Sequence, residues 1–239
     1  MISQTAENGL IGALPADDRH AILGQCSQFE FRQAHVFHEA GDPIDHIHFV
    51  EQGVVSSVAM LSDGRMVETV MVGSEGLVGS VAALAATRSH SRAMAQVGGV
   101  SLRMEAPRLR ALTAERPALR DAIARFNGHL QGELEQSVAC NALHRAEQRF
   151  AKWLLRCHDR VRDQVLHLTQ EYLASMLGSQ RTTLNEAAQG LQRAGAISYS
   201  RGKITILDRE ALERVACECY RVGSGLDRRV GASADRNHG

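Results

Sequence analysis

Hydrophobic residues between Leu168 and Ile197 recur at spacings of three and four in two short runs, which predicts two helices separated by a tight turn. Thr169 is a residue type that caps helix N-termini, and Gly178 and Gly195 are types that end helices. The expected buried positions are Tyr172, Leu173, Met176, Leu177, Leu184, Ala187, Ala188 and Leu191. This stretch therefore predicts a helix-turn-helix.

The outward face of the second predicted helix carries short polar side chains. Ser179 is placed to cap this helix. Such a helix can lie in a DNA major groove with its N-terminal residues against base edges. The alternative is a helical hairpin whose polar face only meets water. The residues expected to contact DNA are Gln170, Ser179, Gln180, Arg181, Thr182, Thr183 and Asn185.

Two β-prone runs follow from Ile197 to Leu207, on either side of Arg201-Gly202-Lys203. A glycine between two such runs predicts a hairpin. A helix-turn-helix followed by a hairpin is a winged helix. In that arrangement we expect Arg201 and Lys203 to contact phosphates, which hold a protein on the duplex without reading its sequence.

Short segments of alternating or β-branched residues, separated by glycines, extend from about residue 29 to 104. This pattern predicts an antiparallel roll or barrel, and Asp63-Gly64 is its clearest hairpin turn. A short helix is expected to begin near Pro15. Residues 1 to about 12 are expected to be a mobile leader.

Apolar residues after Pro117 recur every three or four positions as far as Val138. A stripe this narrow is typical of a coiled-coil seam. The alternative is that the helix packs against the chain's own roll. The residues expected at a dimer interface are Leu119, Ile123, Phe126, Leu130 and Leu134.

Gly178, Arg181 and Thr183 match the turn-and-recognition pattern of a known family, and with the predicted wing the chain resembles the Crp/Fnr transcription regulators. It departs from the pattern at Thr182, where many members carry Glu, and at Glu186, where they carry a second Arg. The resemblance implies an α+β fold and a cytoplasmic homodimer that binds a palindromic double-stranded DNA operator. It also implies that RNA polymerase is a partner and that a small effector binds a roll of the cyclic-nucleotide-binding type.

The chain has 239 residues, which favours two domains of unequal size. We expect an effector-sensing roll with short flanking helices over 14–116 and a dimerisation helix over 117–142. A winged helix-turn-helix domain is expected over 145–210, and a terminal helix with a disordered tail over 211–239.

The formal net charge is zero, but the two parts of the chain differ in sign. Residues 140–239 contain 16 Lys and Arg against 11 Asp and Glu, whereas residues 1–139 contain 11 against 16. The C-terminal part is therefore the part suited to a polyanion. No apolar segment approaches the roughly 20 residues of a membrane helix, and no secretory leader is indicated.

The five cysteines include no C-x-x-C pair, so neither a disulfide framework nor a zinc finger is expected. Only Cys26 lies near the N-terminus, where an Fnr-type iron–sulfur cluster needs several thiolate ligands. Cys217 and Cys219 could bind a metal or sense an oxidant, but two thiols one residue apart cannot complete a tetrahedral site alone. We expect them to pack as buried thiols, and no metal site is predicted.

At the positions that contact the cyclic nucleotide in the family, this chain has other residue types. Ser80 stands in place of the Glu that binds ribose, and His90 and Ser91 stand in place of the Arg-Ser pair that binds phosphate. Arg88 and Arg92 are nearby but out of register. We therefore expect that cyclic AMP is not the effector, and haem or another small effector remains open.

An alternative function would use the histidines of the roll. His46 and His48, with Glu51, resemble part of the metal motif of cupins, which would make the protein a metal-dependent enzyme. Residues two apart on a strand share a face, but Glu51 lies an odd step from both histidines and would need a bulge to join them. Because no paired nucleophile and base is apparent either, we expect a protein that is not an enzyme.

Overall fold

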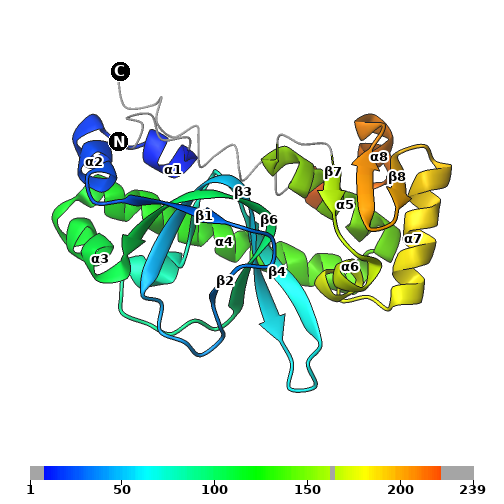
Figure 1. The fold of residues 1–239 in the computed structure, drawn as a ribbon, viewed down its shortest axis with the longest axis horizontal. Helices are drawn as coiled ribbons and strands as arrows, with labels where there is room; N and C mark the ends of the chain where they lie inside the picture. The colour runs from blue at the N-terminus through cyan, green and yellow to red at the C-terminus, as the bar shows by residue number, and fades with distance from the viewer. Residues whose placement is uncertain (1–7, 162–164, 222–239) are drawn as a thin grey trace.

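Six antiparallel strands form a curled sheet in the N-terminal part of the chain (Figure 1). The structure is a computed structural model, and it describes residues 8–161 and 165–221. The strands are β1 (Ser27–Phe31), β2 (Val36–His38), β3 (His46–Met60), β4 (Met66–Val72), β5 (Leu77–Val78) and β6 (Arg92–Glu105). Strands β3 and β6 pair at the centre; β1 and β2 pair with β6, and β4 and β5 pair with β3. The predicted antiparallel roll is confirmed.

Glycines bend the two central strands. The register between β3 and β6 shifts on both sides of Gly53, which has a φ of +95° and lies where a Cβ would be 2.8 Å from the carbonyl oxygen of Gly98. Bulges of this kind bend a strand and increase its twist, so the sheet curls. The Asp63-Gly64 turn joins β3 to β4 as predicted, with the amide of Leu61 donating to the carbonyl of Arg65 at 2.8 Å.

The expected mobile leader is wrong for residues 8–12, while residues 1–7 lie outside the described residues. The Asn8 side-chain amide donates to the carbonyls of Val50 and Gly76, both at 2.7 Å. The next residues form helix α1 (Gly9–Gly12), which buries Leu10 and Ile11 in the roll core. The segment is ordered because Asn8 satisfies two buried carbonyls.

Helix α4 (Pro117–Leu143) begins at Pro117, as predicted, and runs along the roll toward the C-terminal unit (Figure 1). It follows α2 (Ala16–Leu23) and α3 (Ala106–Glu115), which cover one end of the roll. Leu119, Ile123 and Phe126 of α4 are 0% exposed and belong to the roll core. The predicted dimer interface is therefore wrong for these three residues, because their side chains cover the chain's own sheet.

The rest of the predicted seam has different surroundings. Leu130 is half-buried against the same core, whereas Leu134 is 41% exposed and Val138 is 71% exposed. The exposed part of the apolar stripe thus lies in the C-terminal half of α4, beyond the roll.

The C-terminal unit is a small sheet with helices packed on it (Figure 1). Its elements are α5 (Ala146–Arg160), β7 (Val165–His167), α6 (Gln170–Met176), α7 (Arg181–Arg193), β8 (Ile197–Ser200), β9 (Lys203–Ile206) and α8 (Arg209–Val215). Asp208 caps α8 by accepting from the amide of Ala211. The tail predicted from Val222 onward lies outside the described residues.

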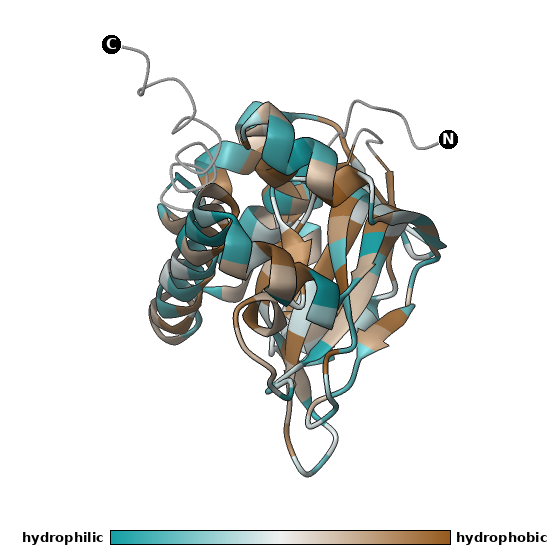
Figure 2. Cartoon of the chain, turned by 90° about the vertical axis from the view of Figure 1, so that its left-hand side faces the viewer, coloured by the Kyte–Doolittle hydropathy of each residue, from teal (hydrophilic) through white to brown (hydrophobic). Residues whose placement is uncertain are grey.

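The two largest hydrophobic cores of the described residues lie one inside the roll and one inside the C-terminal unit. In Figure 2 the hydrophobic positions, drawn in brown, are concentrated in the strands, and hydrophilic positions lie along the outer helices. The second core also includes Val54 and Met71 from the sheet, so the two units pack directly on each other. None of the helices within residues 8–161 and 165–221 is long and apolar enough to cross a membrane.

Candidate nucleic-acid interface

Helices α6 and α7 form the predicted helix-turn-helix. The hydroxyl oxygen of Thr169 accepts from the amide of Tyr172 at 3.2 Å and so caps α6 as expected. Gly178 has a φ of +56° in the turn, and Gly195 has a φ of +70° just after α7. Glycine adopts these left-handed angles without strain, which explains why both helices end where the sequence predicts.

Ser179 does not have the predicted role of N-cap for α7. Gln180 takes that position, and the Ser179 hydroxyl accepts from Arg149 Nη2 at 2.9 Å and donates to the carbonyl of Leu177 at 3.4 Å. The same guanidinium donates to the Leu177 carbonyl at 3.1 Å through Nη1. Arg149, on α5, therefore holds the turn in place, and Ser179 is part of that support.

The outward face of α7 is exposed over its first turn. Gln180, Arg181, Thr182 and Thr183 are all exposed, and the opposite face buries Leu184 among the helices of the unit. The other buried positions are those predicted, namely Ala187, Ala188 and Leu191. Polar side chains with free hydrogen-bonding groups thus stand at the N-terminal end of the helix, where a groove-binding helix meets base edges.

Asn185 lies one turn further along α7 and is half-buried. Its Oδ1 accepts from the side-chain amide of Gln170, on α6, at 3.2 Å. This contact joins the two helices of the motif and engages the side-chain oxygen of Asn185, so the amino group is its remaining donor.

The predicted wing is present as the antiparallel pair β8 and β9, in which Ser200 is paired with Lys203. Arg201 and Gly202 form its tip with φ angles of +50° and +75°, the left-handed pair of a tight hairpin turn. The amide of Leu168 donates to the Gly202 carbonyl at 2.7 Å. The wing is therefore fixed to the start of the helix-turn-helix, with Arg201 and Lys203 exposed.

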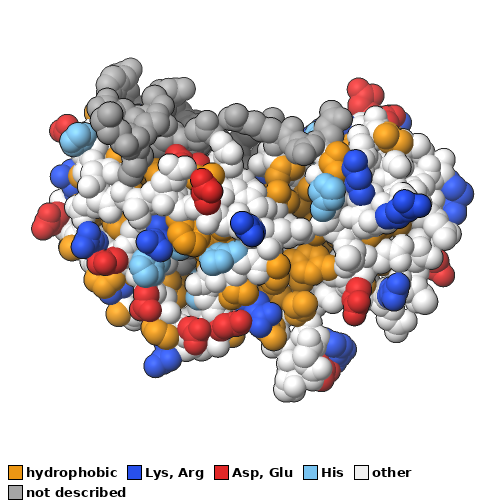
Figure 3. Space-filling view, viewed as in Figure 1, with side chains coloured by type: hydrophobic (Ala, Val, Ile, Leu, Met, Phe, Trp, Pro, Cys, Tyr) orange, Lys and Arg blue, Asp and Glu red, His pale blue; other side chains and the backbone are white. Residues whose placement is uncertain are grey.

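A surface hollow of about 370 Å³ brings these pieces together. Gln170 from α6, Arg181 from α7 and Arg201 from the wing all line it, together with Tyr199 and one acid, Glu171. Lys and Arg side chains are spread over this end of the molecule in Figure 3. The geometry presents donors from three separate elements to one partner surface, which suits a polyanion such as DNA.

The predicted effector residues occupy different environments. Ser80 is buried at the start of the short 3₁₀ helix η1 (Ser80–Ala83), whereas His90 is exposed and Ser91 is half-buried. Arg92 Nε is paired with Glu39 at 2.7 Å, and Arg88 Nη1 donates to the carbonyl of Gly41 at 2.7 Å. Both guanidiniums near the predicted pocket are thus engaged in holding loops of the roll.

The histidines of the roll do not assemble the alternative metal site. His48 is buried, with Nδ1 3.1 Å from Ser101 Oγ and its ring edge-on to those of Phe29 and Phe37, and this burial lowers its pKa to about 3. His46 is exposed. Within the part of the chain that the structure describes, these two residues and Glu51 do not form a cluster of ligand atoms.

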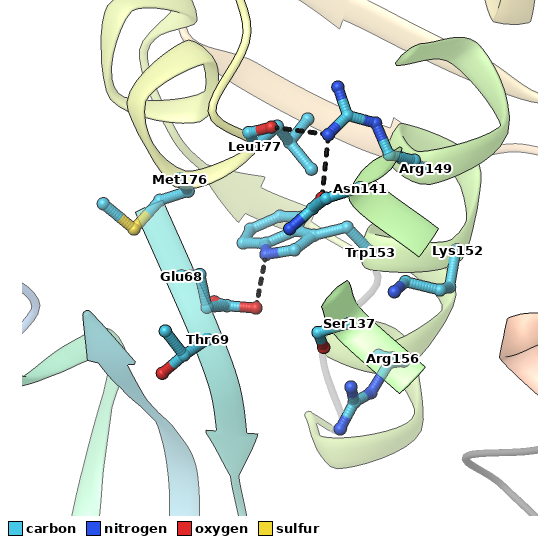
Figure 4. A pocket seen from close by; sticks show the side chains of 10 residues that line it. All are labelled: Glu68, Thr69, Ser137, Asn141, Arg149, Lys152, Trp153, Arg156, Met176 and Leu177. Carbon is cyan, nitrogen blue, oxygen red and sulfur yellow. Dashed lines mark hydrogen bonds between the residues drawn. The ribbon is translucent and has the colours of Figure 1, made fainter. Parts of the chain in front are cut away.

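A polar contact between the two units was not apparent from the sequence. Glu68, on β4, accepts from Trp153 Nε1 at 3.1 Å and from the Ser56 hydroxyl, beside a cleft between the sheet, α4 and α5 (Figure 4). Burial raises the pKa of this carboxyl. A lone Glu on a strand is ordinarily solvent-facing, so only the packing of α5 on the sheet reveals this contact.

Comparisons with known proteins agree with both units. A family model described as a cyclic nucleotide-binding domain matches residues 28–116, and one described as a Crp-like helix-turn-helix domain matches residues 148–215. The chain is similar to a CRP-like cAMP-activated global transcriptional regulator of Mycobacterium tuberculosis H37Rv. The two are 26% identical over 205 residues, which cover 82% of this chain and 91% of the relative.

Solved structures share the fold. A putative transcriptional regulator of the Crp/Fnr family from Eubacterium rectale superimposes with a TM-score of 0.70 at 16% identity, covering 88% of this chain and 99% of its own. FixK2 from Bradyrhizobium japonicum gives a TM-score of 0.67 at 18% identity, covering 80% of this chain and 98% of its own. The roll, the long helix and the winged helix-turn-helix occur here in the same chain and order, so the protein belongs to the Crp/Fnr family of transcription regulators and carries that family's DNA-binding helix-turn-helix.

Proposed function

We propose that the protein is a homodimer that reads a palindromic operator with α7 while the wing contacts the neighbouring phosphates. The observation that carries this proposal is the hollow in which Gln170, Arg181 and Arg201 converge. Arg181 is the first residue of α7 and is exposed. Its planar guanidinium matches the O6 and N7 acceptors of guanine.

The remaining contacts follow from position and chemistry. Thr182 can meet a thymine methyl group, and the amino group of Asn185 can donate to a base edge. Gln180 and Thr183, which are exposed beside Arg181, complete the proposed set on α7. Arg201 and Lys203 would contact phosphates and contribute affinity without base preference.

The proposed dimer uses the exposed half of α4. Leu134, Val138 and Leu143 are large apolar side chains that remain exposed there, and Leu130 leads into them from the roll. A second copy of the same helix would cover these side chains in a self-complementary contact, as two-fold dimers require. Such a dimer presents two copies of α7 to half-sites about one helical turn apart.

The effector of the roll is proposed to be a small molecule other than cyclic AMP. The relative from M. tuberculosis is described as cAMP-activated, but in this chain neither Ser80 nor His90 supplies the carboxylate or the guanidinium that would hold ribose and phosphate. Arg92, which could replace the missing guanidinium, is paired with Glu39. A bidentate Arg–phosphate contact is strong, and an imidazole cannot form the same paired contact.

The proposed output is a change in transcription through RNA polymerase, the partner that the family implies. The metal-dependent enzyme alternative has no support within residues 8–161 and 165–221, since His46 and His48 are not gathered with Glu51. A histidine-based enzyme should lose bound metal in His46→Gln, whereas a regulator should keep both its metal content and its binding to duplex DNA in that variant.

The test is selection of bound sequences from random duplex DNA with the full-length protein. A palindromic consensus is expected, and Arg181→Ala should lose preference at one base pair in each half-site. Arg193→Ala is the matched control, because Arg193 is exposed at the far end of the same helix. Recovery of unrelated sequences by the wild-type protein would contradict the proposal.

A further inference from the structure

Four ligand-bearing side chains meet where α4 ends. Cys140 and His144 come from the end of that helix, and Cys217 and Cys219 come from the segment after α8. One ligand atom from each residue lies within 4.8 Å of all the others. The three thiols are buried, and the His144 side chain is 17% exposed. Cys217 and Cys219 are buried, as expected from the sequence, but the fold adds a third thiol and an imidazole that the sequence did not place beside them.

We propose that these four residues bind one Zn²⁺ ion through the three Sγ atoms and His144 Nδ1. The Sγ atoms of Cys140 and Cys217 are 3.6 Å apart, and Cys219 Sγ lies 3.6 Å from His144 Nδ1. A tetrahedral ion with Zn–S near 2.3 Å and Zn–N near 2.0 Å requires edges of about 3.8 Å and about 3.5 Å. These two separations are close to those of a single Zn²⁺ site, and all four ligand atoms lie within 4.8 Å of one another.

The surroundings of the cluster match those of metal sites. His144 Nε2 is 3.2 Å from Glu218 Oε1, so the Nε2–H can donate a hydrogen bond to the carboxylate while Nδ1 binds the ion. Such a carboxylate partner commonly orients a metal-binding histidine. Gln136 Nε2 donates to Cys219 Sγ at 3.0 Å, and Lys152 Nζ donates to Cys140 Sγ at 3.3 Å. Donors of this kind stabilise sulfur that carries negative charge.

The charges also balance. Binding releases one proton from each of the three thiols to solvent, because the thiolate is the form that ligates. Three thiolates and one Zn²⁺ leave a single negative charge, and the ammonium of Lys152 lies beside Cys140 to offset it. An iron–sulfur cluster contains two or more iron ions joined by sulfides, and its cysteines are divided among those ions. Its thiolates are therefore further apart than the thiolates around a single ion.

The position of the site gives it a structural role. Only His144 and Arg145 separate α4 from α5, so the site lies at the connection between the roll's long helix and the DNA-binding unit. A bound ion would join this connection to the segment after α8, about 75 residues away in the chain. It would therefore clamp the DNA-binding unit to α4.

The experiment uses the full-length protein purified in the presence of Zn²⁺ under reducing conditions. Elemental analysis should find about one zinc per chain, and replacement by Co²⁺ should give the visible bands of tetrahedral cobalt with a thiolate charge-transfer band. Cys217→Ser and His144→Gln should each lower zinc affinity at least tenfold. Cys26→Ser is the matched control, since Cys26 is a half-buried cysteine outside the cluster, and it should keep full occupancy.

Glu218→Gln keeps the test decisive if the ligand variants fail to fold, because the Glu218 side chain is 75% exposed. This variant should bind zinc about 10- to 100-fold more weakly. A chelator should lower the melting temperature of the wild-type protein and leave that of Cys217→Ser unchanged. Absence of zinc together with absence of the cobalt spectrum would overturn the proposal, as would zinc retained equally by Cys217→Ser and His144→Gln. A Cys140–Cys217 disulfide in the protein as isolated would also overturn it.

Discussion

The two halves of α4 carry the same apolar spacing and have opposite surroundings. Leu119, Ile123 and Phe126 in the first half are 0% exposed, whereas Leu134 and Val138 in the second half are 41% and 71% exposed. The difference arises because the roll covers only the first half of the helix. A continuous stripe therefore serves two purposes, folding of the chain first and, as we propose, association of two chains after the roll ends.

The largest effect is expected from Phe126→Ala. Phe126 packs over Gly76 inside the roll, and truncation of a buried Phe to Ala costs about 3 to 5 kcal/mol. The free energy of unfolding, measured in urea, should fall by this amount at every protein concentration. Leu134→Ala is the matched control on the exposed half. Its effect should shrink as the protein is diluted, because the stability of a dimer depends on protomer concentration. If both variants lost the same free energy of unfolding at every protein concentration, the two halves of α4 would not differ in role.

The next effect concerns association. Leu134→Asp combined with Val138→Asp places like charges at the proposed dimer contact, where burial of unpaired charge is unfavourable. Sedimentation should then show monomers with an unchanged far-ultraviolet circular dichroism spectrum, and operator binding should weaken sharply. Ala124→Asp, at an exposed position on the first half of the helix, should remain dimeric. A dimeric double variant would place the association surface elsewhere.

The DNA contacts should reflect the dimer. Each protomer contributes one Arg181, and Arg181→Ala should cost about 1 to 3 kcal/mol per base contact with loss of preference at the matching positions. Arg201→Ala or Lys203→Ala should weaken binding to operator and scrambled duplex about equally. Each wing variant should also reduce, by about one unit, the steepness with which the logarithm of the binding constant falls with the logarithm of salt concentration. The check is a series of binding titrations at several salt concentrations, and a wing variant that changed base preference would reverse the assigned roles.

The smallest predicted effect is a pH dependence of the free energy of unfolding that comes from His48. This residue lies in the roll, which the first half of α4 covers. Burial lowers its pKa from 6.5 to about 3, so the folded state binds fewer protons than the unfolded state between these values. This contribution to stability is present above pH 6.5 and is lost as the pH falls toward 3. Urea midpoints should fall from pH 7 to pH 5 in the wild-type protein and in the exposed control His46→Gln. The fall of the urea midpoint between pH 7 and pH 5 should be smaller in His48→Gln. An equal fall in that variant would assign the pH dependence to other groups.

Local chemistry alone was sufficient to predict much of the fold. The apolar spacing around Gly178, the cap at Thr169 and the turn at Gly202 each depend on residues within one or two turns of each other. Periodicity and turn-forming residues act over such short distances, so the sequence by itself indicated the helix-turn-helix, the wing, the Asp63-Gly64 hairpin and the start of α4 at Pro117. It also indicated that the face bearing Arg181 would be polar.

Contacts between distant segments were decided only by the tertiary structure. The periodicity of α4 could not show that Phe126 would be covered by the roll and Val138 left exposed. Ser179 appeared suited to cap a helix, but Arg149, which is 30 residues away, engages its hydroxyl. Cys140 and Cys217 are 77 residues apart and still approach to 3.6 Å. Side chains this far apart in the chain meet only through the packing of whole elements, and no local pattern of residue types carries that information.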